Sequence, residues 1–118
     1  MHISDIFVLL IAILHIYILV LEMFLWDKPK GMKAFGLTKE FASASKKLAA
    51  NQGLYNGFLS AGLFWGLLSK QNGHDIKLFF LSCIIVAGVY GAMTANKKIL
   101  FIQALPALVA ILLVIFNF

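Results

Sequence analysis

The chain has 118 residues, of which 62% are hydrophobic and 13% charged, and its formal net charge is +5. Soluble domains average about 45–50% apolar and about 25% charged residues, so a water-soluble fold is not expected. A nucleic-acid-binding surface is not expected either, because a basic patch of that kind needs a polar domain to carry it.

The single cysteine, Cys83, lies within an apolar stretch and cannot form an internal disulfide. No Cys and His spacing indicates a zinc site, so no metal site is expected, and no motif identifies a cofactor. The first residues lack the cationic start and the cleavage site of a signal peptide. We therefore interpret the first apolar stretch as a helix of the folded protein.

Four continuous apolar stretches follow one another, at about residues 3–25, 48–68, 76–95 and 99–116. Each has about the 17–25 residues that a helix needs to cross a bilayer, and none alternates as a strand would. The sequence therefore predicts an all-α integral membrane four-helix bundle. It forms a single transmembrane domain over residues 1–118, with helices at about 3–25, 39–69, 76–96 and 99–117.

The only long connection is the loop at residues 26–47, where Pro29 and Gly31 are expected to end the first helix. Thr38 is placed to cap the next helix, with Glu40 in its first turn. Helix two is therefore predicted to begin with a cytoplasmic extension at residue 39. The connections at 69–75 and 96–98 are short turns.

The lysines predict the orientation of the chain. Eight of the ten lie in the first and third connections, and only Lys70 and Lys77 flank the second. Because cytoplasmic loops of membrane proteins carry the excess of Lys and Arg, the basic loop 26–47 is predicted to be cytoplasmic and both termini external (N-out/C-out). The expected location is the cell membrane, as a multi-pass protein in contact with membrane lipid.

Polar side chains within the predicted spans gather toward the cytoplasmic ends, and nothing comparable is apparent toward the outer ends. Polar residues in lipid are costly and tend to mark function. We interpret them as a cytoplasm-facing polar pocket with His15 as its floor. Its ligand-binding residues are expected to be Asn51, Gln52, Asn56, Tyr90 and Gln103.

His15 and Glu22 are seven residues apart, so they share one face of helix one, about 10.5 Å apart along the axis. Imidazole and carboxyl groups in such surroundings can exchange protons near neutral pH. We assign these two a catalytic role, that of handling protons. No serine or cysteine is placed beside His15 as an activated nucleophile.

Helix two carries two adjacent patterns. Gln52, Asn56 and Ser60 recur at a spacing of four and predict a polar stripe. Beside it, Gly53 and Gly57 begin a ridge of small residues that favours close helix packing.

The same residues also have structural interpretations. Buried Asn and Gln often hydrogen-bond a neighbouring helix and fix its register. Glu22 could instead reach the surface or pair with Lys47 or Lys98, and Tyr90 could serve packing. The lysines of loop 26–47 could mark topology alone or also attract anionic lipid.

The string NQGLYNGFLSAGL at residues 51–63, after the His15 and Glu22 pair and the segment EMFLW, resembles the signature of a family of small bacterial and fungal membrane proteins, domain of unknown function 1304. The resemblance covers essentially the whole chain. It implies a four-helix membrane domain and brings no activity with it.

A looser resemblance is to the membrane-associated eicosanoid and glutathione enzymes. Lys47 and Asn51 match the basic residue-xxx-Asn spacing on their second helix, and the long basic first loop and external termini are similar. Those enzymes are trimers that bind glutathione between subunits. They use arginines on the thiol cofactor, and this chain has none, so the likeness is one of architecture.

Three functions follow from these observations, and whether the protein is an enzyme stays open. The first is a membrane enzyme or binder acting on an amphipathic small molecule that enters from the inner leaflet. The second is a small proton-coupled transporter that works as a homo-oligomer, because four helices rarely enclose a path alone. The third is a structural or regulatory membrane subunit without a ligand, whose polar side chains only join helices.

Overall fold

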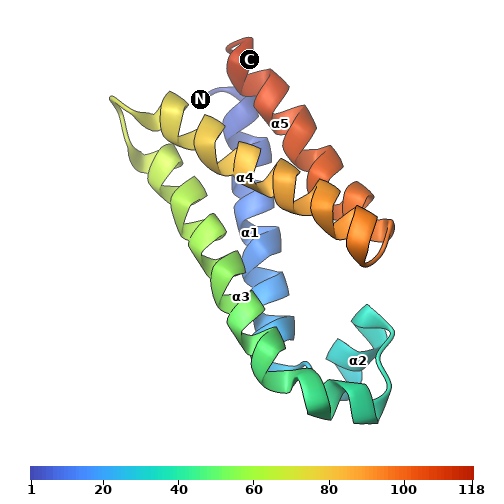
Figure 1. The fold of residues 1–118 in the computed structure, drawn as a ribbon. Helices are drawn as coiled ribbons and strands as arrows, with labels where there is room; N and C mark the ends of the chain where they lie inside the picture. The colour runs from blue at the N-terminus through green and yellow to red at the C-terminus, as the bar shows by residue number, and fades with distance from the viewer. The chain divides into compact units, whose positions relative to one another are not determined.

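The computed structural model describes all residues 1–118, as five α-helices and one π-helical turn without a strand (Figure 1). The all-α prediction is therefore confirmed. Their bounds are α1 (Ile3–Phe24), α2 (Pro29–Phe35), α3 (Lys39–Leu68), α4 (Gly73–Thr94), the π-helical turn η1 (Leu100–Ala104) and α5 (Leu105–Ile115). The chain forms two compact units. The central unit is Ile13–Ser60, and the terminal unit is Met1–Ala12 with Ala61–Phe118.

Helix α2 lies where the sequence predicted only a connection. Pro29 stands at its start, where the fixed φ of proline suits a first helical turn and its missing N–H costs nothing. Gly36 ends the helix at φ 65°, in the left-handed region that glycine adopts readily, and the Leu37 N–H donates to the Met32 carbonyl at 2.9 Å. Pro29, which the sequence analysis expected only to end the first helix, thus begins another.

In the central unit α1 and α3 pack against each other in antiparallel directions. The contact is close because Gly53 presents no side chain: a Cβ built there would lie 2.7 Å from the Met23 Cγ and 3.2 Å from the Leu19 carbonyl oxygen. The start of α3 is capped by Thr38, whose Oγ1 accepts from the Phe41 N–H at 3.1 Å. This cap agrees with the sequence signal at Thr38.

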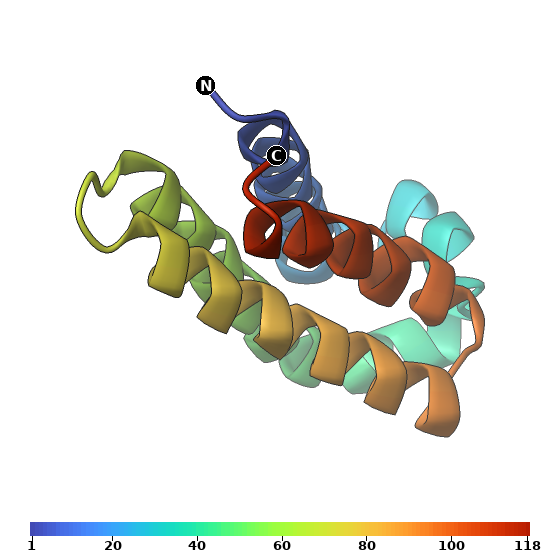
Figure 2. The same cartoon turned by 90° about the horizontal axis from the view of Figure 1, so that it is seen from above.

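In the terminal unit α4 turns back and packs against η1 and α5 (Figures 1 and 2). The closest approach is at the buried Gly88, where a Cβ would lie 2.8 Å from the Ala104 backbone nitrogen. The first and last helices also meet here, since the Ile3 N–H donates to the Phe118 carbonyl at 2.7 Å.

The last apolar stretch is two elements and not one regular helix. Across η1 the Leu105 N–H donates to the Leu100 carbonyl, an i to i+5 bond. Pro106 follows directly. Proline lacks an N–H and its ring crowds the carbonyl four residues earlier, which disfavours an ordinary α-helical turn before it. The wider π turn accommodates that crowding.

Two helices, α1 and α4, are long and apolar enough to cross a membrane, with 22 residues each. The other two predicted spans do not meet both criteria. Helix α3 has 30 residues, but Asn51, Gln52 and Asn56 lower the hydropathy of its second half. The apolar segment Leu100–Ile115 is shorter than 18 residues.

Candidate functional site

The central unit contains a buried hydrogen bond between the Glu22 and Asn56 side chains. The Asn56 Nδ2 donates to Glu22 Oε1 at 2.6 Å, and it also donates to the Gln52 backbone carbonyl at 3.3 Å. The pair joins α1 to α3 beside Gly53, whose absent side chain leaves room for the Glu22 side chain. A carboxyl and an amide from two predicted spans therefore meet directly.

No cation neutralises the Glu22 carboxyl. The two salt bridges between side chains in the structure are Lys46 with Asp27 and Lys77 with Asp5. Lys47, which the sequence offered as a partner for Glu22 within the central unit, is exposed and forms neither. The partner of Glu22 is thus a neutral amide.

Two more polar side chains are buried on the same two helices of the central unit. His15 is 0% exposed and Ser60 is 2% exposed, beside 8% for Glu22 and 5% for Asn56. Because α1 and α3 are antiparallel here, His15 and Ser60 both lie on the same side of the Glu22–Asn56 pair, about 10 Å and about 6 Å along their helices. We call His15, Glu22, Asn56 and Ser60 the polar lane.

The other predicted ligand-binding residues are not among these four buried side chains. Asn51 and Gln52 stand on α3 of the central unit with exposed side chains, and Gln52 contributes only its backbone carbonyl to Asn56. Tyr90 and Gln103 belong to the terminal unit: Tyr90 is exposed on α4, and Gln103 is half-buried within η1. The central unit therefore brings together Glu22 and Asn56 from the predicted set.

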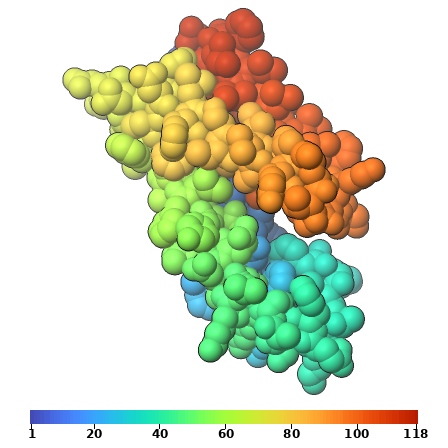
Figure 3. Space-filling model, in the orientation of Figure 1, coloured from blue at the N-terminus to red at the C-terminus, as the bar shows by residue number.

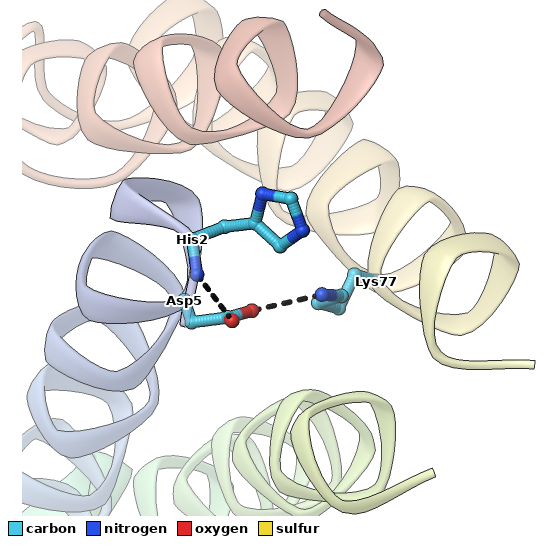
Figure 4. A network of polar contacts seen from close by, with 3 residues as sticks. All are labelled: His2, Asp5 and Lys77. Atoms are coloured by element: carbon cyan, nitrogen blue, oxygen red, sulfur yellow. Dashed lines mark hydrogen bonds and ion pairs between the residues drawn. The ribbon is translucent and has the colours of Figure 1, made fainter. Parts of the chain in front are cut away.

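The terminal unit has a polar cluster of its own, which the sequence analysis missed. Lys77 Nζ lies 2.9 Å from Asp5 Oδ1, and the His2 backbone N–H donates to Asp5 Oδ2 at 3.2 Å (Figure 4). Asp5 precedes the apolar run of α1 and Lys77 stands in the second turn of α4. The opposite charges of these two residues, each beside an apolar stretch, were the available sequence signal.

A pocket of about 180 Å³ adjoins this cluster. Polar and basic side chains predominate in its lining, which consists of His2, Ser4, His74, Lys77, Val114 and Asn117. None of these lining residues belongs to the set that the sequence predicted for ligand binding. Local spacing could not reveal this pocket, because its lining comes from the two ends of the chain and the start of α4. No group of three or more His, Cys, Asp or Glu side chains in the structure could hold a metal ion.

Comparison with known proteins gives a consistent result. Residues 9–115 match the family model described as protein of unknown function (DUF1304). The chain is similar to the uncharacterized protein YpaA of Lactococcus lactis subsp. lactis (strain IL1403), with 33% identity over 106 residues that cover 88% of this chain and 89% of the relative. No solved structure matches.

Proposed function

Since this chain belongs to the DUF1304 family, which is described as of unknown function, we propose a function from its own residues. It is a multi-pass membrane protein whose polar lane binds or processes an amphipathic small molecule. The observation that carries this proposal is the buried Glu22 carboxyl paired with an amide and with no cation. The architectural likeness to the membrane-associated eicosanoid and glutathione enzymes does not support this proposal, because a shared fold does not imply a shared function.

The exposed apolar surface supports placement in a membrane. Only 33% of the apolar window of α1 and 17% of that of α4 is buried within the chain. Large side chains such as Leu10, Phe79 and Val86 are exposed. A water-soluble monomer rarely presents so much contiguous apolar surface, whereas lipid covers it without cost.

We further propose that α3 and the η1–α5 segment complete four spans with both termini external. A span can include several polar side chains when a neighbouring helix supplies their hydrogen-bond partners, and Asn56 of α3 donates such a bond to Glu22. The distribution of lysines supports a cytoplasmic location for the basic loop 26–47. In this orientation the Glu22–Asn56 pair lies near the inner leaflet and His15 lies deeper.

The chemistry of the polar lane fits a ligand with a polar head and an apolar body. Glu22 can accept hydrogen bonds from a head group, and Asn56 holds the carboxyl in position from the facing helix. His15 supplies a second group that can carry a proton deeper in the span. Apolar helix surfaces on both sides suit an acyl or aromatic body.

The proposal is tested by native mass spectrometry of the full chain purified in mild detergent. The wild type is expected to retain a non-covalently bound amphipathic molecule. Glu22→Gln should weaken retention about tenfold, the equivalent of one charge-assisted hydrogen bond. Asp27→Asn, which removes a carboxylate of the same unit outside the lane, should leave it unchanged.

Glu22→Gln separates this function from a purely structural role. A glutamine at position 22 still accepts the Asn56 hydrogen bond, so the helices should remain packed. Wild-type protein that retains no molecule, or Glu22→Gln protein that retains it fully, would favour a structural subunit instead. Uptake into proteoliposomes that depends on a pH gradient, and that Glu22→Gln abolishes, would favour an oligomeric proton-coupled transporter.

A further inference from the structure

The segment of residues 26–47 carries a concentrated positive charge. It contains six lysines, all exposed, and two carboxylates, so its net charge is +4. Asp27 is already paired with Lys46 at 3.1 Å, and the remaining five lysines take part in no salt bridge. This charge is therefore available to an external anion.

The lysines are displayed by a folded segment. Trp26 contacts both helices of the segment. Its Nε1 donates to Ser45 Oγ of α3 at 3.0 Å, and the centre of its ring lies 4.9 Å from the centre of the Phe35 ring of α2. Ser45 Oγ in turn donates to the Phe41 carbonyl at 2.6 Å. In the space-filling view the side chains of α2 and of the first turns of α3 adjoin (Figure 3). The charges thus occupy defined positions on a continuous surface.

Apolar side chains are interspersed with these lysines. Phe35 and Phe41 are exposed within the segment, and Phe24 and Leu48 are exposed at its two borders. A surface that mixes lysine with aromatic and aliphatic side chains is typical of segments that lie at the membrane interface. An acidic protein or a nucleic acid would leave the apolar members without a partner.

Lys30 gives the depth of this surface. Its Nζ lies 5.6 Å from the centre of the Tyr17 ring, so α2 directs this lysine back along α1. Tyr17 is seven residues, or about 10 Å, before the last residue of α1. The Lys30 ammonium therefore lies against the side of α1, where the phosphate of a lipid packed against that helix can pair with it.

From these four observations we infer that residues 26–47 form a binding surface for the headgroups of anionic phospholipids. The inference rests on the membrane placement proposed above and is independent of the polar lane. Topology alone would require lysines anywhere in this loop. Residues 26–47 are instead folded, with exposed aromatic side chains among the lysines and with Lys30 lying along α1. Such a surface favours anionic over neutral lipid in the surrounding membrane.

The two tryptophans of the chain allow a direct test. The full chain is reconstituted in nanodiscs of three parts phosphatidylcholine to one part phosphatidylglycerol, with bromine on the acyl chains of one lipid at a time. Trp65→Phe leaves Trp26 as the reporter at the basic segment. Trp26→Phe leaves Trp65, an exposed residue of the terminal unit, as the control.

Relative to its mole fraction, brominated phosphatidylglycerol is expected to quench Trp26 at least about twofold more than brominated phosphatidylcholine, because each lysine near an anionic surface favours binding severalfold. Trp65 should show no such preference. Substitution of five lysines by glutamine (Lys28, Lys30, Lys33, Lys39 and Lys47) should abolish the preference at Trp26, and Lys70→Gln with Lys97→Gln and Lys98→Gln should not. High salt should reduce it.

Because Trp26 is hydrogen-bonded, the control variant could misfold, and a second measurement avoids any tryptophan substitution. Native mass spectrometry of the otherwise wild-type chain should find phosphatidylglycerol retained in preference to phosphatidylcholine, and the five-lysine variant should lose that preference. Equal quenching and equal retention would overturn the inference. So would a preference that survives the five substitutions, or tight binding of polyglutamate without any lipid preference. Because neither Glu22 nor Asn56 is altered, these outcomes are separate from the ligand test of the polar lane.

Discussion

Helix α1 carries two partly or fully buried carboxyl groups, and the two units of the molecule provide them with different partners. Asp5 in the terminal unit receives an ammonium from Lys77 and a backbone N–H from His2. Glu22 in the central unit receives only the amide of Asn56. A carboxylate whose charge is balanced within the fold serves that fold. A carboxyl held only by a neutral group has no charge partner in the fold, and burial then favours its protonated form, so its proton can take part in other chemistry.

The largest expected effect is at the balanced pair. Lys77→Met should lower the free energy of unfolding by about 2 kcal/mol, because Asp5 would lose its cation. This is below the cost for a fully buried pair, since the Lys77 and Asp5 side chains are 13% and 24% exposed. Thermal unfolding in detergent, followed by circular dichroism, measures the change.

A double-mutant cycle sharpens this result. Asp5→Asn combined with Lys77→Met should restore part of the lost stability, because no unpaired charge would remain. Lys70→Met, at an exposed lysine without an ion pair, is the matched control. If Lys77→Met and Lys70→Met behave alike, Asp5 and Lys77 do not stabilise the terminal unit and the comparison fails.

The second effect concerns the neutral partner of Glu22. Glu22→Leu should cost about 1 kcal/mol, the range of interhelical hydrogen bonds in membrane proteins, because Asn56 would keep only the Gln52 carbonyl as an acceptor. Glu22→Gln should leave stability unchanged, since the glutamine oxygen accepts the same bond. Asn51→Ala, which removes an exposed amide from the same helix as Asn56, is the control and should leave stability unchanged. Equal destabilisation by Gln and Leu would indicate that the Glu22 charge itself holds the helices together.

A smaller effect is expected within the basic segment. Ser45→Ala removes the acceptor of the Trp26 indole N–H and should cost about 0.5–1 kcal/mol. The emission maximum of Trp26, measured in a Trp65→Phe background, should shift as its hydrogen bond is lost. Ser43→Ala changes an exposed serine two residues away, on another face of α3, and should leave both stability and emission unchanged. An unchanged spectrum in Ser45→Ala would mean that this bond does not order the segment.

The smallest effect is the acid titration of the surface pair. Hydrogen bonding from Lys46 lowers the pKa of Asp27 below its ordinary value of 3.8. A carboxyl with a lowered pKa stabilises the folded state above its unfolded-state pKa, and this contribution is lost as the pH falls through the folded-state value. The small stability difference between wild type and Asp27→Asn should therefore be constant near pH 6, begin to shrink as the pH falls below about 4, and disappear once the pH is below the lowered folded-state pKa. If the stability difference persists at low pH, it comes from the packing of the Asp27 side chain and not from its charge.

The sequence predicted the helical class because continuous apolar stretches and local caps are encoded by neighbouring residues. Thr38 illustrates this, since its hydroxyl needs only the backbone three residues on. Helix α2 was missed because Pro29 and Gly31 were interpreted only as breaks. Gly31 is in fact required by the tight turn between α1 and α2: a Cβ there would overlap the Leu25 carbonyl.

The partner of Glu22 could not be obtained from local spacing, because Asn56 is 34 residues away. From charge alone a lysine was one expected partner of Glu22, but the packing of α1 on α3 brings the Asn56 amide to it. The predicted stripe of Gln52, Asn56 and Ser60 is also incomplete, since Gln52 is exposed and the other two are buried. A step of four residues advances about 40° beyond a full turn, so a stripe at that spacing drifts off the buried face within two steps.

The π turn η1 has a consequence for how this chain can vary in length. A turn closed by an i to i+5 bond contains one residue more than an α-helical turn. Removal of one residue between Leu100 and Ala104 would convert it to α-helix and leave the register of α5 intact, with Ala107, Ala110 and Val114 still buried. The surplus residue can also migrate along the turn, which would rotate the Gln103 amide to a new direction while α5 stays in place. The segment is therefore a position where evolution can redirect one polar side chain without repacking a helix.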